Sequence, residues 1–153
     1  MLSTLHTNDA PSTVSRMVNM GIEPFIVGTA VNLIQAQRLI RRICASCKEE
    51  VRDVPPKVLL DVGFLGEAIG TFPLYKGRGC QTCNGTGYKG RVGLYEVLEI
   101  TDGIRELIMM GANSVELRKK AVEDGMLTLR MSGLEKIKLG ITTIEEVLRE
   151  TVL

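Results

Sequence analysis

The chain has 153 residues, enough for one ordinary domain or two small ones, which excludes a large multidomain machine for this chain alone. Apolar residues make up 44% and charged residues 24%, so the composition supports a packed core and excludes a chain that is disordered throughout. Three Phe, three Tyr and no Trp offer few stacking platforms for single-stranded nucleic acid. The net charge of +1 indicates no polyanionic partner, although residues 38–91 hold ten Lys or Arg against five Asp or Glu.

No apolar run reaches the roughly 18 to 20 residues that cross a bilayer, and the N-terminus lacks the features of a secretory signal peptide. We therefore expect a cytoplasmic protein. Thiols stay reduced in the cytoplasm, so four cysteines arranged as two pairs predict a metal site and not disulfides.

The first residues predict a short strand followed directly by a helix. Residues 1–5 are apolar and compatible with a strand, and a polar cluster at 6–9 follows them. Asp9 suits an N-cap and Pro11 a first helical turn, so we expect a helix at about 10–20. A strand at the first residue needs partners that the following residues do not supply. This indicates that the partner strands precede the sequence and that the chain is the C-terminal piece of a longer protein.

The remaining segments predict helices, strands and one irregular module at 44–91. Glu23 and Pro24 begin a second, strongly apolar helix that runs through Ile34. A strand over 38–43 follows, in which Arg38, Arg41 and Arg42 alternate with apolar residues and are interpreted as its solvated face. The later elements that we expect are a loop at 54–57, a short helix at 58–70, a glycine-rich loop at 77–90, a strand at 91–100 and helices near 102–110, 114–124, 128–139 and 143–150.

Three polar residues predict the starts of later helices, because Thr and Asn side chains accept hydrogen bonds from the first turn. They are Thr101, Asn113 and Thr142. Glu116 and Glu145 lie three positions after the second and third of them, which predicts two capping boxes.

Glu96 lies in an apolar row of the strand expected at 91–100. A buried carboxylate needs a partner, so we expect a structural ion pair with a nearby Arg.

Two CxxC motifs carry the strongest chemical signal. Cys44 and Cys47 form the first and Cys80 and Cys83 the second, and each pair places two thiolates on one tight turn, as a tetrahedral ion requires. Four sulfur ligands leave Zn²⁺ no open position, so the predicted site is structural and not catalytic. The second pair continues as CNGTG, which matches the CxxCxGxG repeat of the zinc domains of J-domain chaperones. Those domains use several such repeats, whereas the first pair here lacks the glycines, so we do not expect a chaperone zinc domain.

The single histidine, His6, lies with Thr7 and Asn8 between the expected strand and the expected helix. Three side chains that form hydrogen bonds and precede a helix N-terminus suit the sensing of an anion such as a phosphate. The alternative is ordinary capping and packing, with Asp9 as the N-cap.

No single motif is decisive, but the order and spacing of several segments together are specific. These segments are LSTLHTNDA at 2–10, MGIEPF at 20–25, AQRL at 36–39, the two CxxC pairs, GRVGLYE at 90–96, GMLTLR at 125–130 and GITTIEEV at 140–147. Together they resemble the C-terminal part of the secretion ATPases that power type II secretion and type IV pilus assembly, over essentially the whole chain.

The resemblance implies a RecA-like ATPase that assembles as a cytoplasmic homo-hexamer, uses ATP and Mg²⁺, and acts on inner-membrane platform proteins to extend a pilus or pseudopilus. His6, with Thr7 and Asn8, matches the family's histidine box near the nucleotide phosphates. The four cysteines match the tetracysteine subdomain of the extension and secretion branch, which the branch that retracts pili lacks.

On this interpretation the fold is an α/β fragment in three parts. Residues 1–43 are the C-terminal part of the RecA-like core, 44–91 the metal-binding module, and 92–153 a strand with a helical C-terminal subdomain. The family's phosphate loop lies upstream of the histidine box, and no GxxxxGK(S/T) occurs here, so we expect this chain alone not to hydrolyse ATP.

Two other classes of protein stay open. A free-standing zinc module could bind nucleic acid or protein through residues 38–91, but the excess of Lys and Arg in this segment is weak for nucleic acid, and we expect no such partner. A thiol oxidoreductase is the second alternative, which metal coordination by all four cysteines would exclude.

Overall fold

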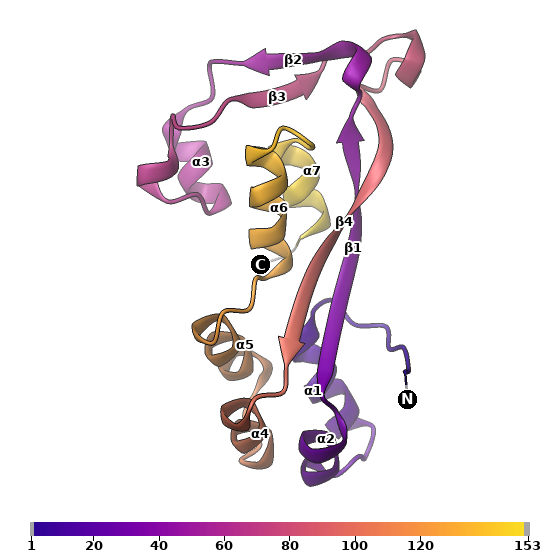
Figure 1. Ribbon diagram of the computed structural model, residues 1–153, viewed down its shortest axis with the longest axis vertical. Helices are drawn as coiled ribbons and strands as arrows, with labels where there is room; N and C mark the ends of the chain where they lie inside the picture. The colour runs from indigo at the N-terminus through magenta and orange to yellow at the C-terminus, as the bar shows by residue number, and fades with distance from the viewer. Residues whose placement is uncertain (1, 152–153) are drawn as a thin grey trace. The chain divides into compact units, whose positions relative to one another are not determined.

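The computed structural model describes residues 2–151 (Figure 1). The α-helices of this part are α1 (Ala10–Asn19), α2 (Pro24–Ala30), α3 (Pro56–Val62), α4 (Asp102–Met109), α5 (Ser114–Glu123), α6 (Leu129–Lys138) and α7 (Ile144–Glu150). The strands are β1 (Leu33–Ile43), β2 (Lys48–Val51), β3 (Leu74–Gly77) and β4 (Tyr88–Glu99). Short 3-10 turns lie at Ala45–Cys47, Gly66–Ala68 and Gln81–Cys83. Strand β1 pairs with β4, and β2 pairs antiparallel with β3.

The chain divides into two compact units. The first unit comprises residues up to 37 together with 95–129, and the second comprises 38–94 together with the residues from 130 onward. Strands β1 and β4 each contribute residues to both units. The mixed α/β class expected from the sequence is therefore present, with two separate two-stranded sheets.

The first unit is built from α1, α2, α4 and α5 around an aliphatic core. Its buried residues are Ala10, Val14, Val27, Ile34, Leu98, Ile100, Ile104, Ile108, Leu117, Ala121 and Met126. The helix starts follow the predicted capping: Asp9 accepts the Ser12 N–H, and Asn113 and Glu116 form a reciprocal capping box. Arg118 forms an ion pair with Asp9, which ties α5 to the start of α1.

The second unit contains α3, α6, α7 and the paired strands β2 and β3. Its buried apolar residues include Ile40, Leu59, Leu94, Ile137 and Val147. The Arg130 guanidinium donates hydrogen bonds to the Val62 carbonyl at the end of α3 and to Thr151 at the end of α7. Carbonyls at helix C-termini favour a cation, so Arg130 joins the ends of two helices of this unit.

Two predicted element boundaries at the N-terminal side are wrong. Residues 2–5 form no strand, because no other strand of the described chain pairs with them, and Met1 lies outside the described residues. The helix expected through Ile34 ends at Ala30. The Ile100 N–H donates to the Asn32 carbonyl at 3.0 Å, so pairing with the end of β4 replaces further helix and β1 begins at Leu33.

Three further differences lie in the middle and C-terminal regions. The sequence did not predict β2 and β3, which are four residues each and pair with each other. The helix expected at 58–70 is α3 followed by a separate turn at Gly66–Ala68. The N-cap of α7 is Thr143 and not Thr142, whose hydroxyl donates to the Arg41 carbonyl instead.

Glu96 is buried, as its place in an apolar row indicates, but its expected ion pair with an Arg is wrong. One carboxylate oxygen accepts the Ala10 N–H at 2.7 Å and the other accepts the Leu129 N–H at 3.1 Å. These amides begin α1 and α6, where backbone N–H groups lack partners within the helix. Two helix starts therefore satisfy the carboxylate, and no Arg of the described chain lies within ion-pair distance of it.

No helix in the described part of the chain has the length and the apolar character that a membrane crossing requires.

Candidate metal centre

The first CxxC pair lies where β1 ends and turns into β2. The Cys44 N–H donates to the Gly87 carbonyl at 2.9 Å, which fixes the end of β1 beside the start of β4. The 3-10 turn Ala45–Cys47 then brings the Cys47 N–H to 3.2 Å from the Cys44 carbonyl. This tight turn places both sulfurs on one side of the chain.

The second CxxC pair forms a matching turn before β4. The Gly85 N–H donates to the Cys80 carbonyl at 2.9 Å. Asn84 and Gly85 adopt left-handed backbone conformations, with φ of 52° and 76°. The glycines that follow the pair in sequence therefore allow the chain to fold back around its own sulfurs.

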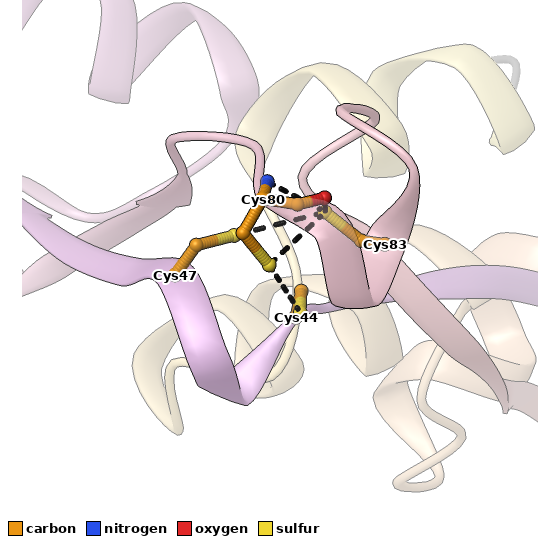
Figure 2. Close-up of side chains that lie close together, drawn as sticks. All are labelled: Cys44, Cys47, Cys80 and Cys83. Atoms are coloured by element: carbon orange, nitrogen blue, oxygen red, sulfur yellow. Dashed lines mark hydrogen bonds between the residues drawn. The ribbon is translucent and has the colours of Figure 1, made fainter.

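Figure 2 shows the four cysteine side chains converging from the two turns. Their sulfurs all lie within 4.8 Å of one another. The Cys44 sulfur is 3.9 Å from that of Cys80, and the Cys47 sulfur is 3.9 Å from that of Cys83. These distances are far longer than a disulfide bond of about 2.05 Å. A tetrahedral ion with Zn–S distances of about 2.3 Å places its sulfurs about 3.8 Å apart, so the cluster fits Zn²⁺.

Backbone N–H groups point at two of the sulfurs and favour their charged form. Gly79 donates to the Cys47 sulfur at 3.3 Å, while Cys80 and Gly87 each donate to the Cys83 sulfur at 3.2 Å. Amides that surround ligands in this way orient them and tune their affinity for the metal.

The thiols differ in pKa because burial and hydrogen bonding act in opposite directions. Burial raises the pKa of Cys47 to about 11. Burial also acts to raise the pKa of Cys83, but the N–H groups of Cys80 and Gly87 outweigh it and lower this pKa to about 6. The hydrogen bonds around Cys83 therefore favour its thiolate form, and a bound cation would favour the thiolate form of all four cysteines.

Close backbone contacts explain why glycine occurs at two positions beside the cluster. A Cβ atom on Gly77 would lie 2.0 Å from the Gly87 carbonyl oxygen, and one on Gly79 would lie 2.7 Å from that of Gly85. Cys44, Cys47 and Cys83 are buried, so the cluster has little room for water or a substrate. A buried site with four sulfurs has the character of a structural metal centre and not of a catalytic one.

His6, Thr7 and Asn8 lie directly before α1, in the first unit, whereas the cysteines belong to the second. The His6 side chain is exposed, and the Thr7 hydroxyl lies 2.6 Å from that of Thr13 in the first turns of α1. The structure therefore brings the four cysteines together and keeps the three predicted phosphate-sensing residues as one segment at a helix start.

Sequence reasoning missed several contacts made by the cysteine turns and by the residues next to them. The sequence placed Gly79 and Gly87 in a glycine-rich loop but did not show that their N–H groups donate to the cysteine sulfurs. The contact of Tyr88 with Thr143 and that of Glu146 with Arg41 had no signal in the sequence, since these residues lie far apart along the chain.

Comparison with known proteins gives matches to one family and to several of its members. Residues 1–149 match the family described as Type II/IV secretion system protein. The chain is 53% identical over 151 residues to the type IV pilus assembly ATPase PilB of Myxococcus xanthus, a match that covers 99% of this chain and 27% of that protein. It is 49% identical to PilB of Pseudomonas aeruginosa and 42% identical to type II secretion system protein E of Dickeya dadantii, with 99% of this chain and 26% and 29% of those proteins covered. The chain thus spans about a quarter of the length of these relatives.

Proposed function

This chain belongs to the type II/IV secretion ATPase family, and from that premise we propose that it acts as part of an ATPase that drives type IV pilus assembly or type II protein secretion. The observation that carries the proposal is the 53% identity to a pilus assembly ATPase over 99% of the chain. Because the match covers only 27% of that relative, ATP hydrolysis, hexamer assembly and force generation are proposed for the longer polypeptide and not for these residues alone.

Within such an ATPase, we assign Cys44, Cys47, Cys80 and Cys83 to a structural Zn²⁺ site. Three sulfur–sulfur distances of 3.7–3.9 Å and the N–H groups directed at the sulfurs support this role. The ion would crosslink the turn that follows β1 to the turn that precedes β4.

We further propose that His6, Thr7 and Asn8 sense the nucleotide phosphates in the longer ATPase. The exposed His6 side chain and the adjacent start of α1 suit contact with an anion that another part of the polypeptide holds. The partners proposed for the chain are the rest of this ATPase, the neighbouring subunits of a homo-hexamer in the cytoplasm, and inner-membrane platform proteins of the machine.

Deletion of the gene in its own cell tests the function and separates the two pathways. Loss of surface pili with normal protein secretion is the expected result for a pilus ATPase, and the reverse is expected for a secretion ATPase. A deletion strain that retains both processes would contradict the proposal, provided that no second member of the family is expressed.

A further inference from the structure

Tyr88 of the second unit follows a residue that contacts the metal cluster, and its side chain contacts the segment that contains α7. Gly87 contacts both CxxC pairs, since its N–H donates to the Cys83 sulfur at 3.2 Å and its carbonyl accepts the Cys44 N–H at 2.9 Å. The next residue, Tyr88, has its backbone position set by these two hydrogen bonds. Its side chain contacts segment 141–150, which contains α7.

Tyr88 contacts this segment at the start of the helix. Its hydroxyl lies 2.7 Å from the Thr143 hydroxyl, and Thr143 also accepts the Glu146 N–H as the N-cap of α7. The Arg41 guanidinium stacks over the Tyr88 ring, with its central carbon 4.2 Å from the ring centroid. Tyr88 therefore contacts a helix cap with its polar end and a β1 cation with its face.

Further hydrogen bonds to segment 141–150 come from the residues just before the first cysteine. The Ile43 N–H donates to the Ile141 carbonyl at 2.8 Å, and the Arg41 carbonyl accepts the Thr142 hydroxyl at 2.9 Å. The Arg41 amide and guanidinium both donate to the buried Glu146 carboxylate, at 2.9 and 2.8 Å.

All these docking groups lie within three residues of Cys44 or within five residues of Cys83. We propose that Tyr88 is a positioning residue that couples metal binding at the four cysteines to the docking of segment 141–150. An ion bound to the sulfurs fixes residues 41–44 and 87–88 relative to each other, and this spacing is the one that segment 141–150 recognises. The role goes beyond the proposed function, since it concerns how the metal site and α7 stabilise one another whether or not ATP is hydrolysed.

Thermodynamic linkage makes the coupling reciprocal. If the ion stabilises the docked helix, the docked helix must raise the affinity for the ion by the same factor. A change at Tyr88, which is not a ligand, should therefore weaken zinc binding, and removal of zinc should loosen α7.

The test uses the full chain with Tyr88→Phe, which removes only the hydroxyl that contacts Thr143. We expect zinc affinity, measured by competition with a chromogenic chelator at about pH 7, to fall roughly threefold to tenfold, as loss of one hydrogen bond would produce. The absorption spectrum of the Co²⁺-loaded protein should keep its four-thiolate character, because the ligands are unchanged. Amides of α7 should exchange with solvent faster in zinc-free wild type than in the zinc form, while those of α5 in the first unit should change little.

Two control variants separate coupling from general loss of stability. Tyr75→Phe removes a hydroxyl from another tyrosine of the second unit, whose ring lies under Lys48, and should leave zinc affinity unchanged. Ile137→Val shortens a buried core residue of α6 and leaves every hydrogen bond of Tyr88 and of the cysteines in place. An equal loss of affinity in Ile137→Val at a matched loss of thermal stability would overturn the proposal.

The outcomes also separate this inference from the assignment of the metal site. Wild-type protein that binds neither Zn²⁺ nor Co²⁺ would remove the site and the coupling together. Wild-type protein that binds zinc tightly, with Tyr88→Phe equal to it in affinity, would leave the metal site intact and overturn only the role of Tyr88.

Discussion

A single buried carboxylate, that of Glu96, holds the starts of two helices. Its oxygens accept hydrogen bonds from the N–H groups of Ala10 and Leu129, and the residue is 2% exposed. Burial raises the pKa of Glu96 despite these two hydrogen bonds, because desolvation of the charged form outweighs them. The carboxylate thus contributes by accepting two hydrogen bonds at helix starts, although burying its charged form costs desolvation free energy.

Removing this carboxylate should therefore destabilise the first unit strongly. Glu96→Ala leaves two buried amides without an acceptor and opens a cavity, so we expect the free energy of unfolding to fall by about 3 kcal/mol. Urea denaturation followed by circular dichroism measures this loss. The control is Glu99→Ala, an exposed glutamate three residues along the same strand, which should cost less than about 0.5 kcal/mol. Similar losses in the two variants would show that the two N–H contacts contribute little.

Glu146 on α7 differs from Glu96 because cations surround it. Burial acts to raise its pKa, but hydrogen bonds from the Arg41 side chain and amide outweigh burial and lower it. A carboxyl with a lowered pKa in the folded state stabilises the protein above its unfolded pKa of about 4.5, and this contribution is lost as pH falls through the folded pKa.

We accordingly expect Glu146→Gln to cost about 2 kcal/mol at about pH 7, since Arg41 and Arg149 are partly exposed and water screens the pair. The difference between wild type and variant should shrink as the pH falls below about 4.5. Comparing both proteins at each pH cancels the effect of acid on the cysteines. Glu145→Gln, at an exposed position of the same helix, should show no comparable pH-dependent difference.

Among the elements, the turns that carry the cysteines depend most on a bound ion. We expect about one zinc per chain in protein purified without chelator, because the four sulfurs have the spacing of a tetrahedral site. Removing it with a strong chelator should lower the melting temperature and expose the thiols to a maleimide reagent. Elemental analysis that finds well under one metal per chain in reduced protein would contradict the assignment.

Local signals predicted elements well and distant pairing poorly. The helices α4, α5 and α6 lie within one or two residues of their expected bounds, because capping residues and helical periodicity act within a few residues. The strands β2 and β3 had no comparable signal: Lys48 to Val51 is mostly charged, and its partner strand begins only at Leu74, after α3. The predicted end of α2 was wrong for the same reason, since the hydrogen bond between Asn32 and the distant Ile100 determines where the helix gives way to β1.

The sequence predicted the four ligands of the metal cluster but not the contacts made by the residues around them. Two CxxC spacings identify Cys44, Cys47, Cys80 and Cys83 without any structure, because the geometry of the turn is local. The expected ion pair of Glu96 with an Arg was wrong. The sequence shows where each Arg is, but it does not show which backbone N–H groups will lie near the carboxylate. Thr142 and Thr143 are neighbours of the same type, so capping preference alone could not choose between them.

At the scale of the whole molecule, the chain holds about a quarter of the length of its relatives and contains no GxxxxGK(S/T) segment. The Lys and backbone amides of such a loop hold the β and γ phosphates of ATP, so the chain alone should neither bind ATP tightly nor hydrolyse it above background. Titration calorimetry with ATP and Mg²⁺ checks the first expectation, and a phosphate-release assay checks the second. A dissociation constant in the micromolar range would mean that the described residues contain a nucleotide site of another kind.

The proposed role of His6 can be tested only in the longer ATPase, where a phosphate loop would present the nucleotide. An imidazole N–H can donate to a phosphate oxygen, and the start of α1 just beyond Asp9 favours the same anion. His6→Ala should then lower ATP turnover by much more than it lowers ADP affinity, because the lost contact is to the γ-phosphate, which ADP lacks. His6 is exposed in the first unit, so its removal should cost this unit little stability. If His6 only packs or caps, thermal stability should fall while turnover per folded hexamer stays nearly intact, and that result would remove His6 from the nucleotide site.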